Sequence, residues 1–334
     1  MPMHTREQDG AIRVPGFVDL QVNGFMGIDF SDFELTEEQV REAFHAVLTS
    51  GTAAFLPTII TSPPSVYRRN IPLLIRVMQR EEFAGRVLGL HLEGPFISSV
   101  PGAVGAHDPE HVCRPDLRLL EELLDLGAGR VTLVTVAAEL PGIDHLVRQA
   151  RHRGVVVSVG HSLFWCDDLD RAYTAGATAL THLGNGLPNQ LARHVNPIWA
   201  GLADERYAVM VISDGHHLPV PVLKVVVRAV GVDRLIVVSD AAPVAGLPAG
   251  EYQVMGNRAI LEPTGRLFNP DKQCLVGSAA TMLLCMNTLS SLGLLTIDDL
   301  LRIGVTNPLR LIGISPSELR PHQGLLYRDG VFTV

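Results

Sequence analysis

The chain has 334 residues, of which 47% are hydrophobic and 19% charged, so it can bury the core of a barrel and still carry an appendage. Its formal net charge of −8 disfavours nucleic acid or an anionic membrane as the main partner. No apolar stretch reaches the length of a signal peptide or a membrane span, and the four cysteines (Cys113, Cys166, Cys274 and Cys285) form no C-x-x-C pair. We therefore expect a soluble, cytoplasmic protein with reduced thiols.

Short β-branched runs alternate with amphipathic segments along most of the chain, which is typical of parallel βα units. Eight strands are predicted, at Val14–Gln21, Thr52–Thr58, Arg86–Leu92, Val131–Ala137, Val155–Val159, Thr178–Leu183, Ala208–Ile212 and Arg234–Ser239. Helices are predicted between them at Thr36–Thr49, Asp116–Leu126, Ile143–His152, Asp167–Ala175 and Val220–Val230. The last of these helices is apolar on nearly every face, so we expect it to be buried.

The number of strands alone does not distinguish a closed (β/α)8 barrel from a doubly wound open sheet. The polar side chains at the strand ends do distinguish them. Ligand-capable residues follow nearly every strand: Gln21 and Asn23, Thr58, His91 and Glu93, Glu139, His161, His182, Asp214 with His216 and His217, and Asp240. In a barrel these ends converge on one mouth, where active sites are built, whereas an open sheet would spread them along a crevice. The pattern favours a closed, TIM-type (β/α)8 barrel.

After Asp240 the pattern changes. Short antiparallel strands are predicted at Tyr252–Leu261 and Leu267–Asn269, helices at Gly277–Gly293 and Ile297–Ile303, and a closing hairpin at Gly324–Val334. We expect residues 14–250 and 270–312 to form the catalytic barrel, and residues 1–13, 251–269 and 313–334 to form a reduced small β appendage.

Glu93, His161 and His182 stand at or just past the ends of three different predicted strands. A single histidine at a strand end more often only caps its strand by hydrogen bonding. Three ligand-capable side chains on adjoining strand ends favour a metal site instead. Two imidazoles and one carboxylate, with a fourth position open, suit a divalent metal used in hydrolysis. Such a site would make the barrel one of the metal-dependent hydrolase kind. Zinc is the expected metal, and iron, manganese or cobalt would fit the same ligands.

Other side chains suggest the remaining chemistry. Asp240 could take a proton from water and pass it to a leaving amine, the alternative being a simple helix N-cap. Of the adjacent His216 and His217, only one is expected to face the site. Arg193 could bind a phosphate in bidentate fashion, although a lone loop arginine is more often a solvated surface residue. The chain has no dinucleotide-binding glycine motif, no Walker A motif and no G-x-S-x-G elbow.

Seven motifs between Pro15 and Met282 together resemble those of the N-acetylglucosamine-6-phosphate deacetylases, a family of the amidohydrolase superfamily. They are, in order, PGFVDLQVNGFMGIDF, HLEGPFIS, VGHS, GATALTHLGNG, ISDGHHLP, VVSDAAPVAG and LVGSAATM. The resemblance implies that Glu93, His161 and His182 bind the metal and that Asp240 is the catalytic aspartate. Gln21 and Asn23 match a Q-x-N that replaces the H-x-H of most superfamily relatives, which favours a single metal.

The same resemblance implies the contacts with substrate. His107 and His217, rather than His216, would contact the substrate, and Asn185 with Gly186 would bind its phosphate. Gln21 and Asn23 are also expected among the substrate-binding residues. Arg193 matches an arginine that is delivered across a dimer interface, so a homodimer is implied. Gly184, Gly186 and Leu187 depart from the family pattern, as does the HVNPIW that follows Arg193. These departures lie among the residues expected to bind the substrate, and they leave the metal ligands and Asp240 unchanged.

The expected reaction is hydrolysis of the N-acetyl group of an amino-sugar phosphate, giving glucosamine 6-phosphate and acetate from N-acetylglucosamine 6-phosphate. One alternative is a related amidohydrolase acting on a different, non-phosphorylated N-acyl or cyclic amide substrate. A non-catalytic metal- or sugar-binding barrel is the other alternative, and Asp240 argues against it because a binder has no use for a proton carrier.

Overall fold

The computed structural model describes residues 4–7, 10–320 and 324–334. Eight parallel strands form its central sheet: β3 (Phe17–Val22), β6 (Thr52–Ile60), β7 (Leu90–Glu93), β8 (Val131–Val136), β9 (Val156–Val159), β10 (Ala179–Leu180), β11 (Ala208–Ile212) and β12 (Leu235–Val238). A parallel bridge between Val22 and Ala241 joins β3 to the chain leaving β12 and closes the sheet into a barrel. The TIM-type barrel is thereby confirmed, and the open sheet is excluded.

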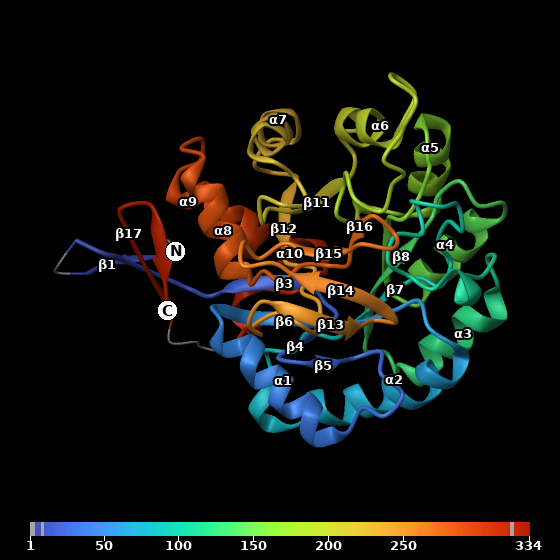
Figure 1. Cartoon of the computed structure of the whole chain (residues 1–334), viewed down its shortest axis with the longest axis horizontal. Helices are drawn as coiled ribbons and strands as arrows, with labels where there is room; N and C mark the ends of the chain where they lie inside the picture. The colour runs from blue at the N-terminus through green and yellow to red at the C-terminus, as the bar shows by residue number, and fades with distance from the viewer. Residues whose placement is uncertain (1–3, 8–9, 321–323) are drawn as a thin grey trace.

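Helices surround the barrel and cover its strands (Figure 1). They are α1 (Glu37–Thr49), α2 (Pro64–Met78), α3 (Leu117–Leu126), α4 (Ile143–His152), α5 (Cys166–Ala175), α6 (Pro197–Ala203), α7 (Val220–Val230), α8 (Met282–Ser291), α9 (Ile297–Leu301) and α10 (Asn307–Leu311). Their starts follow local chemistry: Thr36 and Gln39 form a capping box at α1, and the Asp116 carboxylate accepts two backbone N–H groups at α3. Helix α2 was not predicted from the sequence, because Pro72 in its interior is typical of a helix break.

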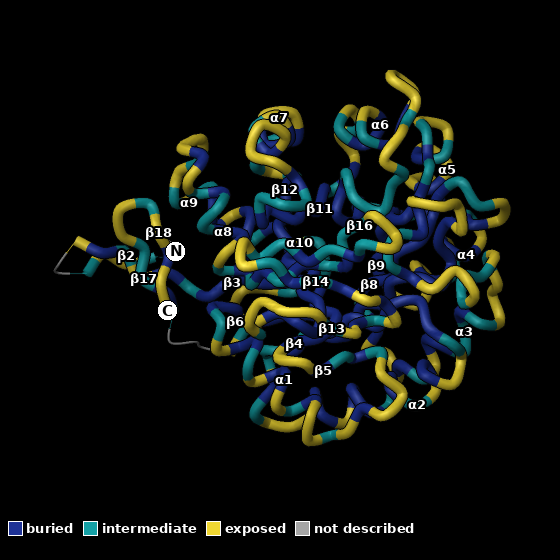
Figure 2. The backbone as a smooth tube through the Cα atoms, viewed as in Figure 1, coloured by how far each residue is buried: buried dark blue, intermediate teal, exposed yellow. Residues whose placement is uncertain are grey.

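The core lies between the barrel strands and the inner faces of the helices, and Figure 2 shows the strands as buried. All nine residues of β6 are buried, as expected for a strand covered on both sides. Phe44 of α1 packs edge-to-face against Phe55 of β6 and Phe83, with both ring centroids at 5.2 Å. Such contacts hold the helical layer against the barrel.

The expectation that helix α7 would be buried is wrong. Its inner face is buried, but Val220, Val222 and Val225 are 41%, 41% and 52% exposed. A helix in the outer layer of a barrel is covered on one side only, so apolar residues all round leave an apolar outer face.

Three smaller sheets accompany the barrel. One contains β1 (Thr5–Arg6), β2 (Ile12–Val14), β17 (Leu325–Arg328) and β18 (Val331–Thr333), and lies at the side where both termini are found (Figure 1). Another contains β13 (Gly250–Val254), β14 (Asn257–Leu261), β15 (Leu267–Asn269) and β16 (Cys274–Leu275). The third is the short pair β4 (Gly24–Phe25) and β5 (Ile28–Asp29).

The segments expected to form one reduced appendage thus lie in two different sheets. Residues 1–3, 8–9 and 321–323 of those segments lie outside the described residues, and the division into barrel and appendage stays a prediction. Across the described part of the chain, no helix is both long and apolar enough to cross a membrane. All four cysteines are free thiols.

Candidate active site

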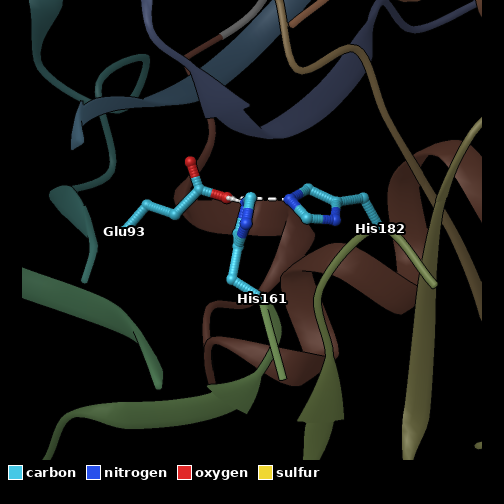
Figure 3. A group of neighbouring side chains, drawn as sticks. All are labelled: Glu93, His161 and His182. Carbon is cyan, nitrogen blue, oxygen red and sulfur yellow. Dashed lines mark hydrogen bonds and ion pairs between the residues drawn. The ribbon is translucent and has the colours of Figure 1, made fainter. Parts of the chain in front are cut away.

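Three strand ends bring Glu93, His161 and His182 together inside the barrel mouth (Figure 3). Glu93 ends β7, while His161 and His182 each follow their strand, β9 or β10, by two residues. The Glu93 Oε1 atom lies 2.8 Å from His182 Nε2 and 3.3 Å from His161 Nε2. All three side chains are buried, and their ligand atoms lie within 4.8 Å of one another.

The donor atoms of this cluster fit a divalent cation. His161 Nδ1 lies 2.8 Å from the Ala103 carbonyl oxygen and donates to it, so Nε2, which faces Glu93, is the nitrogen that can give up its proton and bind a metal ion. Burial alone would raise the pKa of Glu93, but hydrogen bonds from His161 and His182 outweigh it and hold the pKa well below its usual range. An ionised carboxylate and imidazole lone pairs are the donor set that a zinc ion takes.

The backbone is strained at the chemically important positions. Among the described residues, eight non-glycine residues have a positive φ, and three of them are His161 (48°), His182 (30°) and Asp240 (51°). This left-handed region is unfavourable for side chains other than glycine, and it persists only where the surrounding structure enforces it. Here it turns three strand-end side chains inward over the mouth.

Asp240 lies beside the cluster and is held by two amides. Its Oδ1 accepts hydrogen bonds from Gln21 Nε2 at 2.9 Å and Asn23 Nδ2 at 2.7 Å. Gln21 Nε2 also lies 2.9 Å from Glu93 Oε1, so one neutral amide bridges the two carboxylates. Burial and the charge of Glu93 raise the pKa of Asp240, which suits a group that must take up and release a proton.

Asp19 fixes the backbone at Ser239, next to Asp240, and at Gln21. This role was not predicted from the sequence. Its Oδ1 accepts from the backbone N–H groups of Ser239 at 3.1 Å and Gln21 at 3.2 Å, and Oδ2 accepts from the Ser239 hydroxyl. Burial raises the pKa of Asp19 to about 7. The signal was a carboxylate inside the otherwise apolar strand FVDLQV, where a charged residue needs partners.

A cavity of about 250 Å³ opens above these side chains. Nine residues singled out from the sequence line it: Asn23, Glu93, His107, His161, His182, Asn185, Gly186, His217 and Asp240. Gln21 lies behind Asp240 and does not line the cavity. His216 points away, with Nε2 at 2.9 Å from the Thr264 carbonyl oxygen, so of the two adjacent histidines it is His217 that faces the cavity.

His107 is neutral and presents a donor. Its Nδ1 accepts the Thr61 backbone N–H at 3.3 Å, so in the neutral ring the proton sits on Nε2. That Nε2 lies 3.6 Å from Glu93 Oε2 and 3.2 Å from His161 Nε2. Burial, followed by the charge of His161, lowers the pKa of His107 to about 3.

Arg193, like Gln21, does not line this cavity. Its loop is exposed, and its carbonyl oxygen accepts from Trp199 Nε1 at 3.1 Å. Over the described residues, neither lysine nor arginine lines the cavity. A phosphate bound there would therefore meet no guanidinium or ammonium group among the residues that line the cavity.

Two glycines from different loops enclose the His161 ring. A Cβ atom at Gly186 would lie 2.7 Å from His161 Nδ1, and one at Gly105 would lie 3.0 Å from Cε1. Gly186→Ala is therefore expected to push the ring aside and weaken metal affinity by about 10- to 100-fold. Titration against a competing chelator measures this.

Gly129→Ala is the matched control, because Gly129 has a similarly positive φ of 75° with nothing within 4 Å of its Cβ position. An unchanged metal affinity in Gly186→Ala would show that the ring is not confined by this contact.

Comparison with known proteins agrees with this geometry, although no protein-family model matches the chain. The chain is 33% identical to the N-acetylglucosamine-6-phosphate deacetylase of Danio rerio, over 93% of this chain and 78% of that protein. It is 27% identical to the N-acetylgalactosamine-6-phosphate deacetylase of Escherichia coli O157:H7, over 94% of this chain and 81% of that protein.

Among solved structures, the N-acetyl-D-glucosamine-6-phosphate deacetylase of Mycobacterium smegmatis, in complex with N-acetyl-D-glucosamine-6-phosphate, superposes with a TM-score of 0.84. The two chains are 26% identical, and the match covers 97% of this chain and 87% of that one. The resemblance seen in the sequence motifs is confirmed, and the chain belongs to the N-acetylglucosamine-6-phosphate deacetylase family of amidohydrolases.

Proposed function

We propose that the protein hydrolyses the N-acetyl group of N-acetylglucosamine 6-phosphate to give glucosamine 6-phosphate and acetate. The observation that carries this proposal is the convergence of Glu93, His161, His182 and Asp240 on one cavity. The names of the relatives supply the substrate class, and the donor set supplies the reaction type, hydrolysis of an acyl bond assisted by a metal.

Glu93, His161 and His182 would hold the divalent metal, for which one zinc per chain is our first expectation and iron, manganese or cobalt the alternatives. When bound, such an ion polarises an acyl carbonyl and makes a nearby water more acidic. Asp240, with its raised pKa, takes the proton from the attacking water and then delivers it to the departing amine. His107, whose Nε2 carries the proton, donates a hydrogen bond to the oxygen on which negative charge develops.

The phosphate group needs a cation from elsewhere, and we propose that a second copy of the chain supplies it. The exposed loop that carries Arg193 adjoins an apolar surface made of Val195, Trp199, Val220, Val222 and Val225, which are 59%, 51%, 41%, 41% and 52% exposed. Exposed apolar side chains on two neighbouring helices, α6 and α7, favour association, and a twofold dimer would present the same loop to each partner. Arg193 of one subunit then reaches the phosphate in the other, next to Asn185 and Gly186.

This dimer predicts complementation between two defective variants. Arg193→Ala is expected to raise KM for the phosphorylated sugar by about 10- to 100-fold, the effect of losing a charge-assisted hydrogen bond. Asp240→Asn alone is expected to be nearly inactive. A mixed dimer contains one site with an intact Asp240 and an intact Arg193 from its partner, so mixing the two proteins should restore activity. Absence of recovery, despite subunit exchange shown by mass spectrometry, would place Arg193 in its own subunit's site.

The substrate assignment is tested by kcat/KM on N-acetylglucosamine 6-phosphate, N-acetylgalactosamine 6-phosphate and N-acetylglucosamine. We expect the first to be the best substrate and the unphosphorylated sugar to be the poorest. The galactosamine epimer is the second candidate, because the relative from Escherichia coli O157:H7 carries that name. Equal turnover with and without the phosphate would contradict the proposal and favour a non-phosphorylated N-acyl or cyclic amide substrate. The four free thiols and a metabolic substrate of this kind lead us to place the enzyme in the cytoplasm.

A further inference from the structure

The loop after β11 contains a second histidine–carboxylate pair, separate from the metal cluster. His217 Nδ1 lies 2.8 Å from Asp214 Oδ2, and the two side chains are only 5% and 3% exposed. The other oxygen, Asp214 Oδ1, accepts the backbone N–H groups of His216 and His217, both at 2.9 Å. The carboxylate therefore makes all of these bonds within its own loop and fixes the His217 ring relative to the backbone.

This bonding determines which nitrogen of His217 is protonated. Burial alone would raise the pKa of Asp214, but the hydrogen bond from His217 and the two backbone donors lower it to about 2. Above that pH the carboxylate is ionised and can only accept, so Nδ1, which faces it, carries a proton. The nitrogen left for the cavity is Nε2, on the opposite side of the ring. His107 is held in the opposite way, with Nδ1 accepting from Thr61.

The position of the loop indicates which part of the substrate His217 meets. Gly184, in the loop that carries Asn185 and Gly186, lies so close to Leu218 that a Cβ atom at Gly184 would be 3.0 Å from Leu218 Cδ2. The His217 loop and the loop assigned to the sugar phosphate are therefore neighbours. Asp214 can balance the charge of a fully protonated His217 ring, which would then donate to an anion from Nε2.

We propose that Asp214 is a positioning residue: it holds His217 with Nδ1 protonated and Nε2 directed at the phosphate end of the substrate. The identity of that substrate rests on the function proposed above. The orientation of the ring does not, because it follows from contacts within the chain.

Asp214→Asn is the variant that separates this role from simple support of the loop. The asparagine oxygen can still accept both backbone N–H groups, but its NH₂ group faces Nδ1 as a donor, so Nδ1 stays unprotonated and the ring stays neutral, with its proton on Nε2. Nε2–H can still donate to a phosphate, but this hydrogen bond lacks the positive charge that Asp214 balances in the wild type. We expect KM for N-acetylglucosamine 6-phosphate to rise by about 10- to 100-fold, with a much smaller change in kcat. Asp116→Asn is the matched control, because Asp116 also accepts two backbone N–H groups but no histidine N–H, and it should leave KM unchanged.

A double-mutant cycle with His217→Gln tests whether Asp214 acts through the histidine. In the His217→Gln protein, Asp214→Asn should have no further effect on KM. A rise in KM as large as that in the wild-type background would overturn the proposal and leave Asp214 as a support of the loop.

A second readout is independent of turnover. Nitrogen-15 NMR of the metal-loaded protein, with His217 assigned by comparison with His217→Gln, should show Nδ1 protonated in the wild type and Nε2 alone protonated in Asp214→Asn. An unprotonated Nδ1 in the wild type would contradict the proposal even if the enzyme is active. A further outcome is a protein that shows the expected tautomer but turns over no amino-sugar phosphate. That result would support the orientation of the His217 ring, but it would overturn the proposed function and the phosphate part of this proposal.

Discussion

Asp240→Asn is expected to lower kcat by about 10²- to 10⁴-fold, the range in which a positioned general acid–base group contributes. Asparagine has nearly the shape of aspartate, so its oxygen can keep the hydrogen bonds from Gln21 and Asn23. It cannot take up the proton that the attacking water must lose, nor supply the proton that the departing amine needs. The expected variant is folded and loaded with metal but catalytically poor.

Steady-state kinetics, metal analysis and thermal unfolding measured together test this expectation. Asp233→Asn is a suitable control, because Asp233 is an exposed carboxylate paired with Arg302 far from the cavity. If Asp240→Asn retained kcat within a few-fold of the wild type, another group would have to carry the proton. If it lost its metal, the loss of activity would no longer report on proton transfer.

Removal of a metal ligand should have the other large effect. His182→Ala removes one of three buried donor atoms, and Glu93→Gln keeps an oxygen but removes the negative charge that faces both imidazoles. We expect metal affinity to fall by more than the roughly 10- to 100-fold that the loss of an outer-shell partner costs. Activity should fall with metal content and return partly when zinc is added in excess.

Metal content per chain after dialysis measures this effect directly. His145→Ala is the control, because its side chain is 69% exposed on α4, well outside the cavity. A His182→Ala protein that kept one metal per chain would contradict the assignment of the ligands. Loss of metal without loss of activity would contradict the need for the metal.

The barrel and the chemical centre of the site were predictable from the sequence because both depend on local patterns. Continuous apolar runs such as Val156–Val159 and Leu235–Val238 mark strands buried on both faces, and the polar residues that follow them must meet at one end of a closed barrel. Helices with clear caps, such as α1 and α3, were also predictable. Helix α2 was not, because Pro72 masks its periodicity.

The parts that could not be predicted depend on contacts between distant segments. The role of Asp19 arises from a bond to Ser239, 220 positions away, and the outer face of α7 depends on what covers that helix. The pairing of Asp214 with His217 is local, but its function depends on where the loop lies in the barrel mouth. In our proposal, Arg193 reaches a site only in a second subunit. The sequence of one chain does not reveal how two subunits are arranged.

The most direct test of the account is to supply N-acetylglucosamine 6-phosphate to the metal-loaded wild-type protein and to quantify acetate and free amine. We predict that both products form in equal amounts, that removal of the metal with a chelator stops their release, and that zinc restores it. Failure of the fully loaded protein to release acetate from the phosphorylated sugar, or release that continues undiminished after the metal is removed, would contradict the central claim.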